Sequence, residues 1–193
     1  MVVHKMGEVD WHIREATDWD VPMLQQLIAE SVRGLARIDY TPEQIEAAIG
    51  TAWGVDSQLV CDRTYFVAEA KGAIVACGGW SYRKTCFGGD GHTARDTTPL
   101  DPARDAARIR AFFVRPTWTR KGIGRALLAR CEDEARNAGF QRVELVATLP
   151  GHRLYRNCGF EGDQPVRYEL PGGVGIDFIP MGKTLAPGVE EPT

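Results

Sequence analysis

The feature that most constrains the fold of this chain is a short apolar run that ends abruptly at a proline. Residues 109–114 read I-R-A-F-F-V, and this concentration of β-branched and aromatic side chains favours a β-strand. Pro116 lacks the N–H that would continue a ladder of strand hydrogen bonds, so the strand must end there. Residues 123–135 then carry apolar side chains at helical spacing, which predicts that the chain passes from strand to helix within a short turn.

The turn between this strand and this helix predicts a site for an anion. It places Arg120 and Lys121 beside Gly122 and Gly124 at the start of the helix. Glycines adopt positive φ angles and let the backbone approach a ligand closely, while the first N–H groups of a helix lack partners within it and carry its positive dipole end. The natural ligand of such a turn is a phosphate or a pyrophosphate.

The glycine spacing excludes the commoner phosphate loops. The turn is not a Walker loop of the form G-x-x-x-x-G-K-[ST], and it lacks the third glycine of the dinucleotide-binding pattern G-x-G-x-x-G. A G-x-G pair taken alone is equally typical of a turn that merely joins a strand to a helix.

Strand, turn and helix together resemble the acetyl-CoA-binding motif of the GNAT (Gcn5-related) N-acetyltransferase superfamily. In that family the turn has the form [Q/R]-x-x-G-x-[G/A], and its backbone amides hold the pyrophosphate of CoA. Aligned on Gly122 and Gly124, this chain has Thr119 where the family has Gln or Arg. A second segment, residues 154–160, reads L-Y-R-N-C-G-F and resembles the L-Y-x-x-x-G-F segment of the family.

The resemblance implies a fold and an activity. We expect a single-domain GNAT fold of the α/β (α+β) class, in which helices flank a mixed, mostly antiparallel central sheet. The expected enzyme is an N-acetyltransferase, an acyltransferase that transfers groups other than aminoacyl groups. It would use acetyl-CoA as co-substrate and no metal, and a primary amine of a small molecule or peptide would attack directly in a ternary complex. The resemblance also allows a homodimer.

The resemblance further implies which residues act. Tyr155 matches the tyrosine that protonates the departing thiolate of CoA. The strand would pair with the pantetheine arm and polarise the thioester carbonyl through a backbone N–H. The residues implied to bind acetyl-CoA are Phe112, Phe113, Val114, Thr119, Arg120, Lys121, Gly122, Ile123, Gly124 and Arg125.

A general base is not evident. Some relatives place a glutamate early on the strand, where this chain has Arg108, Ile109 and Arg110. The acidic residues that could replace it are Glu69, Asp101, Asp105 and Glu144. Each is better explained as a solvated or salt-bridged carboxylate than as a base, and water relays or an acceptor that arrives partly neutral would make a dedicated base unnecessary. The alternative to an enzyme is a catalytically silent CoA-binding sensor of the same fold.

The pattern along the chain predicts the element order β-α-α-β-β-β-α-β-α-β-β. The predicted strands are 11–15, 65–70, 73–82, 109–114, 142–147, 166–170 and 175–181, and the predicted helices follow Asp20, Thr41, Gly122 and Leu149. Gly78 and Gly79 indicate a β-bulge. Residues 83–105 lack periodicity and are expected to build the acceptor pocket, either as an acidic lip for a cationic amine or as a solvated loop of mixed charge.

Length and composition bound the remaining possibilities. The 193 residues fit one domain, expected at 11–185 between tails at 1–10 and 186–193. The net charge of −3 argues against non-specific binding of nucleic acid. No apolar stretch approaches the ~20 residues of a membrane span, and the first residues lack the apolar core of a signal peptide, so we expect a cytoplasmic protein with no membrane partner. The five cysteines form no C-x-x-C pair, which favours reduced thiols in the core.

Overall fold

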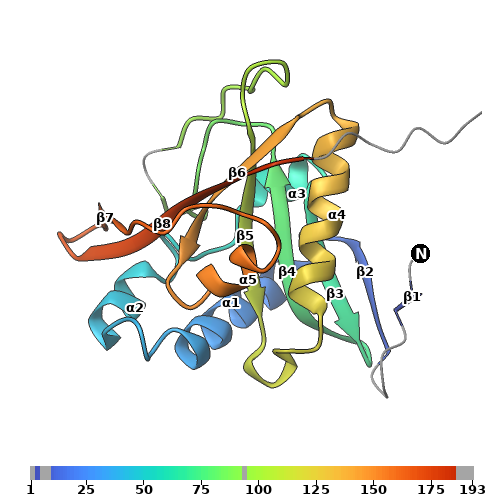
Figure 1. The fold of residues 1–193 in the computed structure, drawn as a ribbon. Helices are drawn as coiled ribbons and strands as arrows, with labels where there is room; N and C mark the ends of the chain where they lie inside the picture. The colour runs from blue at the N-terminus through green and yellow to red at the C-terminus, as the bar shows by residue number, and fades with distance from the viewer. Residues whose placement is uncertain (1–2, 5–9, 93–94, 186–193) are drawn as a thin grey trace, which may run out of the picture.

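The structure is a computed structural model that describes residues 3–4, 10–92 and 95–185. Its centre is one sheet with the strand order β1-β2-β3-β4-β5-β6-β8-β7 (Figure 1). The strands are β1 (Val3–His4), β2 (Trp11–Glu15), β3 (Tyr65–Ala70), β4 (Ala73–Ser81), β5 (Ala107–Val114), β6 (Arg142–Thr148), β7 (Val166–Glu169) and β8 (Gly175–Thr184). Neighbouring strands are antiparallel, except that β5 and β6 are parallel. The predicted mixed, mostly antiparallel sheet is therefore confirmed.

Helices cover both faces of this sheet (Figure 1). They are α1 (Val21–Leu35), α2 (Pro42–Ala48), α3 (Ser57–Cys61), α4 (Ile123–Asn137) and α5 (His152–Arg156), with 3-10 turns η1 (Asp18–Asp20) and η2 (Pro116–Trp118). Along β3, Phe66 and Ala68 pack on the face covered by α4, whereas Tyr65 and Val67 pack on the face covered by α1, α2 and α3. Within the described residues, no helix has the length and apolar character needed to cross a membrane.

Every strand and helix that the sequence predicts is present in the predicted order. Two further elements, α3 and the short β1, were not predicted. β1 lies in the segment that was expected to be an N-terminal tail, and it pairs with β2. Some predicted limits were wrong: β5 begins at Ala107 rather than at Ile109, and β8 ends at Thr184 rather than at Met181. The expected C-terminal tail, 186–193, lies outside the described residues.

All five cysteines are unpaired, as expected. Cys77 and Cys131 are buried in the two halves of the core. Cys61 and Cys86 are exposed, so the expectation that these two thiols fill core positions was wrong.

The start of α2 fixes the chain that forms one wall of the functional site. The predicted cap is confirmed: the Thr41 N–H donates to Gln44 Oε1 at 2.9 Å, and the Gln44 N–H donates to Thr41 Oγ1 at 3.2 Å. The neighbouring Tyr40 hydroxyl donates to the carbonyl of Asp177 at 2.8 Å and accepts the N–H of Leu149 at 2.9 Å. These bonds tie the segment between α1 and α2 to β8 and to the end of β6.

The predicted bulge is confirmed in the ladder between β4 and β5. The register shifts between Cys77 and Gly79, and opposite this shift Ala111 adopts a positive φ of 56°. A Cβ atom at Gly79 would lie 2.8 Å from the carbonyl oxygen of Thr64, which is backbone and cannot rotate away. Glycine is therefore the residue that this close approach permits.

The parallel strands β5 and β6 separate soon after they begin. Their ladder contains two pairs, Ala107 with Val143 and Arg108 with Glu144. Beyond that point β5 continues beside β4 and β6 continues beside β8, and the two strands diverge (Figure 1). The divergence opens the sheet between the carboxyl ends of β5 and β6.

We predict that Gly79→Ala lowers the free energy of unfolding by about 1–3 kcal/mol, because the added methyl group overpacks the bulge. Urea denaturation measures this change. Gly182→Ala is the matched control, since its Cβ would lie 3.7 Å from the nearest atom, an ordinary contact. Equal stabilities for the two variants would contradict the tight approach at Gly79.

Candidate functional site

The opening between β5 and β6 holds a cavity of about 660 Å³. Its walls come from the diverging parts of β5 and β6, from the turn before α4, from α5 and from the end of α1. Of the residues predicted to act at the site, all except Lys121 line it. The structure therefore brings segments far apart in the sequence to one cavity.

The wall contributed by β5 has an unpaired edge. Beyond Arg108 the ladder to β6 has ended, so the backbone groups of β5 that face the opening have no strand partner. Such groups favour a ligand that can itself donate and accept hydrogen bonds like a strand. Phe112, Phe113 and Val114 lie on this wall as predicted, but the Val114 N–H already donates to Ser31 Oγ at 3.3 Å.

The turn before α4 has the backbone of an anion site. Arg120 adopts a φ of 63° and Gly122 a φ of 80°, and α4 begins at the next residue, Ile123. Residues of alternating handedness form a concave row of N–H groups, and here that row continues into the free N–H groups of the first helical turn. The exposed side chains of Arg120 and Arg125 lie beside it.

Two residues of the predicted binding turn have other contacts. The Thr119 hydroxyl donates to the carbonyl of Pro116 at 3.0 Å and so closes η2. Lys121 is exposed, and its Nζ lies 5.8 Å from the centre of the Trp118 ring rather than on the cavity wall. The turn therefore depends on its backbone and on Arg120 and Arg125 for its attraction to an anion.

Tyr155 lies on the cavity wall opposite β5. Its ring packs edge-on against Phe112 at 6.2 Å and against Phe160 at 5.7 Å between centres. None of the described residues forms a hydrogen bond with its hydroxyl. Burial raises the pKa of Tyr155 well above its usual value of 10.0, so the hydroxyl keeps its proton at neutral pH.

None of the four acidic residues considered as a base lines the cavity. Glu69 pairs at 3.0 Å with an arginine of β2, and Glu144 pairs with Arg108. Asp105 accepts the N–H of Asp101 at 2.8 Å in the turn before β5. Among the described residues, no group of three or more His, Cys, Asp or Glu side chains is placed to hold a metal ion.

The segment 83–105 contributes to the cavity through three residues. It extends the hairpin beyond β4, because Lys84 and Thr85 donate backbone hydrogen bonds to Thr98 and Asp96. Residues 86–88 then line the cavity, whereas none of the acidic side chains of the segment does. The expectation of an acidic lip was therefore wrong, and the segment is instead the alternative, a loop of mixed charge.

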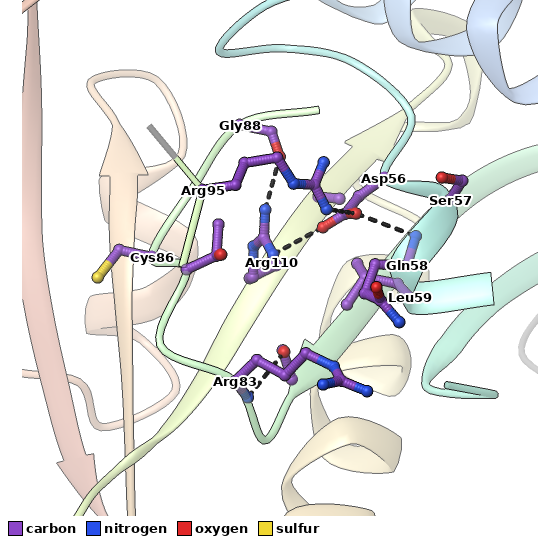
Figure 2. Close-up of polar contacts among 12 residues, drawn as sticks. Asp56, Ser57, Gln58, Leu59, Arg83, Cys86, Gly88, Arg95 and Arg110 are labelled. Carbon is purple, nitrogen blue, oxygen red and sulfur yellow. Dashed lines mark hydrogen bonds and ion pairs between the residues drawn. The ribbon is translucent and has the colours of Figure 1, made fainter. Parts of the chain in front are cut away.

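A buried charge network holds this segment in place, and sequence reasoning missed it (Figure 2). Asp56, which is fully buried, pairs with Arg110 at 2.6 Å and also with Arg95. Arg110 donates to the carbonyl of Gly88 at 2.5 Å, which joins β5 to the cavity wall. Burial lowers the pKa of Arg110, and the charge of Asp56 opposes this shift. An arginine within an apolar strand was the available signal, since buried charges require partners.

We predict that Gly124→Leu weakens acetyl-CoA binding on the order of 10-fold or more. A Cβ at this position already lies 3.2 Å from Leu154, so a larger side chain must enter the space in front of the turn. Isothermal titration measures the affinity. Arg125→Gln is the comparison variant and should cost less, because its exposed charge is screened by solvent. An unchanged affinity in Gly124→Leu would show that acetyl-CoA does not bind in front of this turn.

Comparison with known proteins gives independent information. The model described as "Acetyltransferase (GNAT) family" matches residues 27–160. Aminoglycoside N(6')-acetyltransferase type 1 of Stenotrophomonas maltophilia is 35% identical over 63 residues, which span 31% of this chain but only 41% of that relative's length.

Solved structures show the same fold. A GCN5-related N-acetyltransferase from Rhodopseudomonas palustris aligns with a TM-score of 0.68 and 18% identity, over 96% of this chain and 99% of that one. The PaiA N-acetyltransferase of Thermoplasma acidophilum, in complex with coenzyme A, aligns with a TM-score of 0.60 and 17% identity, over 90% and 98% of the two chains.

Proposed function

The chain belongs to the acetyltransferase (GNAT) family, and from this premise we propose that it transfers the acetyl group of acetyl-CoA to a primary amine of a small molecule. The observation that carries the proposal is the cavity between β5 and β6. It joins an anion-binding turn, an unpaired strand edge and the Tyr155 hydroxyl in one space. These three features match the three parts of acetyl-CoA, namely the pyrophosphate, the amide-containing arm and the thioester.

The residues of this chain fit acetyl-CoA by their chemistry. The positive φ angles at Arg120 and Gly122 form the row of N–H groups that an anion requires. Phe112 offers backbone groups of β5 to the amides of the pantetheine arm, whereas the backbone of Phe113 faces its partner Cys77 on β4. When bound, acetyl-CoA supplies the activated acetyl group, and PaiA of Thermoplasma acidophilum, which shares the fold, was solved with coenzyme A.

Tyr155 is proposed to act as the general acid. The neutral amine attacks the thioester carbonyl, a C–N bond forms and the C–S bond breaks. The departing thiolate takes the proton of the Tyr155 hydroxyl, and the nitrogen loses its extra proton to solvent. Two observations support this role: Tyr155 lines the cavity, and burial keeps its hydroxyl protonated by raising its pKa.

A small-molecule acceptor is favoured over a peptide. A peptide N-terminus or lysine would favour an open acidic groove, but residues 86–88 wall the cavity and none of its described lining residues is acidic. This makes the acceptor a molecule that enters the cavity rather than one that lies along a surface.

We expect Tyr155→Phe to lower kcat by on the order of 100-fold while leaving acetyl-CoA affinity within about twofold, because the ring stays and only the proton donor is lost. Release of free CoA measures turnover, and titration measures affinity. Tyr82→Phe, outside the cavity wall, is the control. Equal loss of turnover and affinity would refute the role. Binding of acetyl-CoA without turnover in the native chain would instead support the silent CoA-binding sensor.

We also predict that kcat/KM rises with pH up to about pH 10 and shows no descending limb in this range. The rise reflects deprotonation of the amine. Because the pKa of Tyr155 is raised above 10.0, its acid form persists across this range and adds no descending limb. Rates measured from pH 6 to pH 10 test this, and a descending limb centred below pH 9 would contradict the assignment of Tyr155.

A further inference from the structure

We infer that the acceptor amine carries one positive charge in solution and an apolar body about the size of an aromatic ring, and that short polycationic amines are excluded. This inference rests on the proposed function. It follows from the end of the cavity that lies away from the anion-binding turn, which is defined here as the acceptor end and is lined by Trp53, residues 86–88, Arg110, Val146, Thr148 and Phe178.

Aromatic side chains form one wall of the acceptor end. The Phe178 ring lies 6.0 Å from the Trp53 ring and 5.7 Å from the Phe87 ring between centres. Trp53 and Phe178 are almost fully buried, so they are held by the core rather than free to swing away. An apolar acceptor gains free energy by covering the half-buried Phe87 ring, whereas a strongly hydrated acceptor loses its hydration there.

The described residues that line the cavity offer no carboxylate to a cation. Among the described residues that line it, the charged ones are all arginines: Arg110, Arg120, Arg125 and Arg153. A buried ammonium group requires a negative or hydrogen-bonding partner, and without one it is strongly disfavoured. An acceptor with a second ammonium group would therefore place that charge among arginines.

The carboxylate behind the acceptor end is already neutralised. Asp56 is fully buried, and both of its oxygens face guanidinium groups, one of Arg110 and one of Arg95 (Figure 2). Arg95 also lies 3.3 Å from Asp90, which balances the charge of the network. The network therefore supplies rigidity and a charged wall, but no negative charge that an acceptor can use.

This environment also prepares the amine for attack. Loss of hydration disfavours the ammonium form and so lowers the pKa of an amine that enters. The single ammonium group of a monoamine can release its proton and become the nucleophile. The acceptor end thus performs the task for which the described lining residues supply no carboxylate.

A matched pair of acceptors tests the inference. Hexylamine and 1,5-diaminopentane have the same number of heavy atoms and differ by one added charge. We expect kcat/KM, measured by CoA release, to favour hexylamine on the order of 100-fold, and 2-phenylethylamine to exceed ethylamine by on the order of 10-fold or more. Titration of each amine into the protein saturated with CoA should give the same order of affinities.

Each outcome decides between the claims. Equal or better acetylation of 1,5-diaminopentane or of spermidine would overturn the inference while leaving the proposed function intact. Equal or better acetylation of a short peptide would overturn the inference and also the small-molecule acceptor of the proposed function, but not acetyl transfer itself. Acetylation of spermidine would indicate that the charge of spermidine farthest from the reacting amine lies in the adjoining cavity, which contains Glu144, Glu161 and Glu169. Acetylation of no amine, despite binding of acetyl-CoA, would overturn both.

A substitution in the wall tests the electrostatic cause. Thr148 lies at the end of β6, lines the cavity and is half-buried, and its Oγ1 accepts the N–H of Gly151 at 3.2 Å. Thr148→Asp adds a carboxylate that can keep this bond, and Thr148→Asn is the uncharged control of the same shape. We expect the preference for hexylamine to fall at least about 10-fold in Thr148→Asp and to persist in Thr148→Asn. The same change in both variants would refute the electrostatic cause.

Discussion

The site depends on the separation of β5 from β6 after two paired residues. Leaving strand backbone unpaired is costly unless another partner satisfies it. The structure limits this cost because each strand keeps its other neighbour: β5 stays paired to β4 across the bulge, and β6 is paired to β8 from Arg142 to Thr148. The gap is therefore a stable feature of the sheet, and its free edge is a binding surface for a ligand that has amide groups.

The charged side chains of the cavity serve two different functions, one at each end of the cavity. At one end, Arg120 and Arg125 are exposed beside the start of α4, where they add to the field of the helix N-terminus. At the other end, Arg110 is buried and paired with Asp56, so its charge is fixed and partly neutralised. Mobile, solvated charges suit the capture of an anion from solution. A fixed pair suits the shaping of a pocket that must stay dry.

Sequence patterns predicted what depends on local chemistry. Pro116 ends β5, Gly122 begins α4 with a positive φ, and Thr41 caps α2, because each effect acts within a few residues. The cavity wall could not be predicted in the same way. Asp56 and Arg110 meet across long stretches of chain, and α3 has only five residues, so its periodicity is too short to detect.

The lack of a carboxylate general base among the described residues that line the cavity follows from the same geometry. Glu144 lies at the last position of β6 that pairs with β5, close to the site along the chain. Its carboxylate pairs with Arg108 across the ladder and is neutralised there. A carboxylate in the gap itself would stabilise an ammonium ion and so hold the acceptor in its unreactive form. A pocket lined by aromatic rings and a paired arginine favours the neutral amine instead. The proposed exclusion of polycations and the lack of a carboxylate among the described cavity residues would thus be two results of one arrangement of side chains.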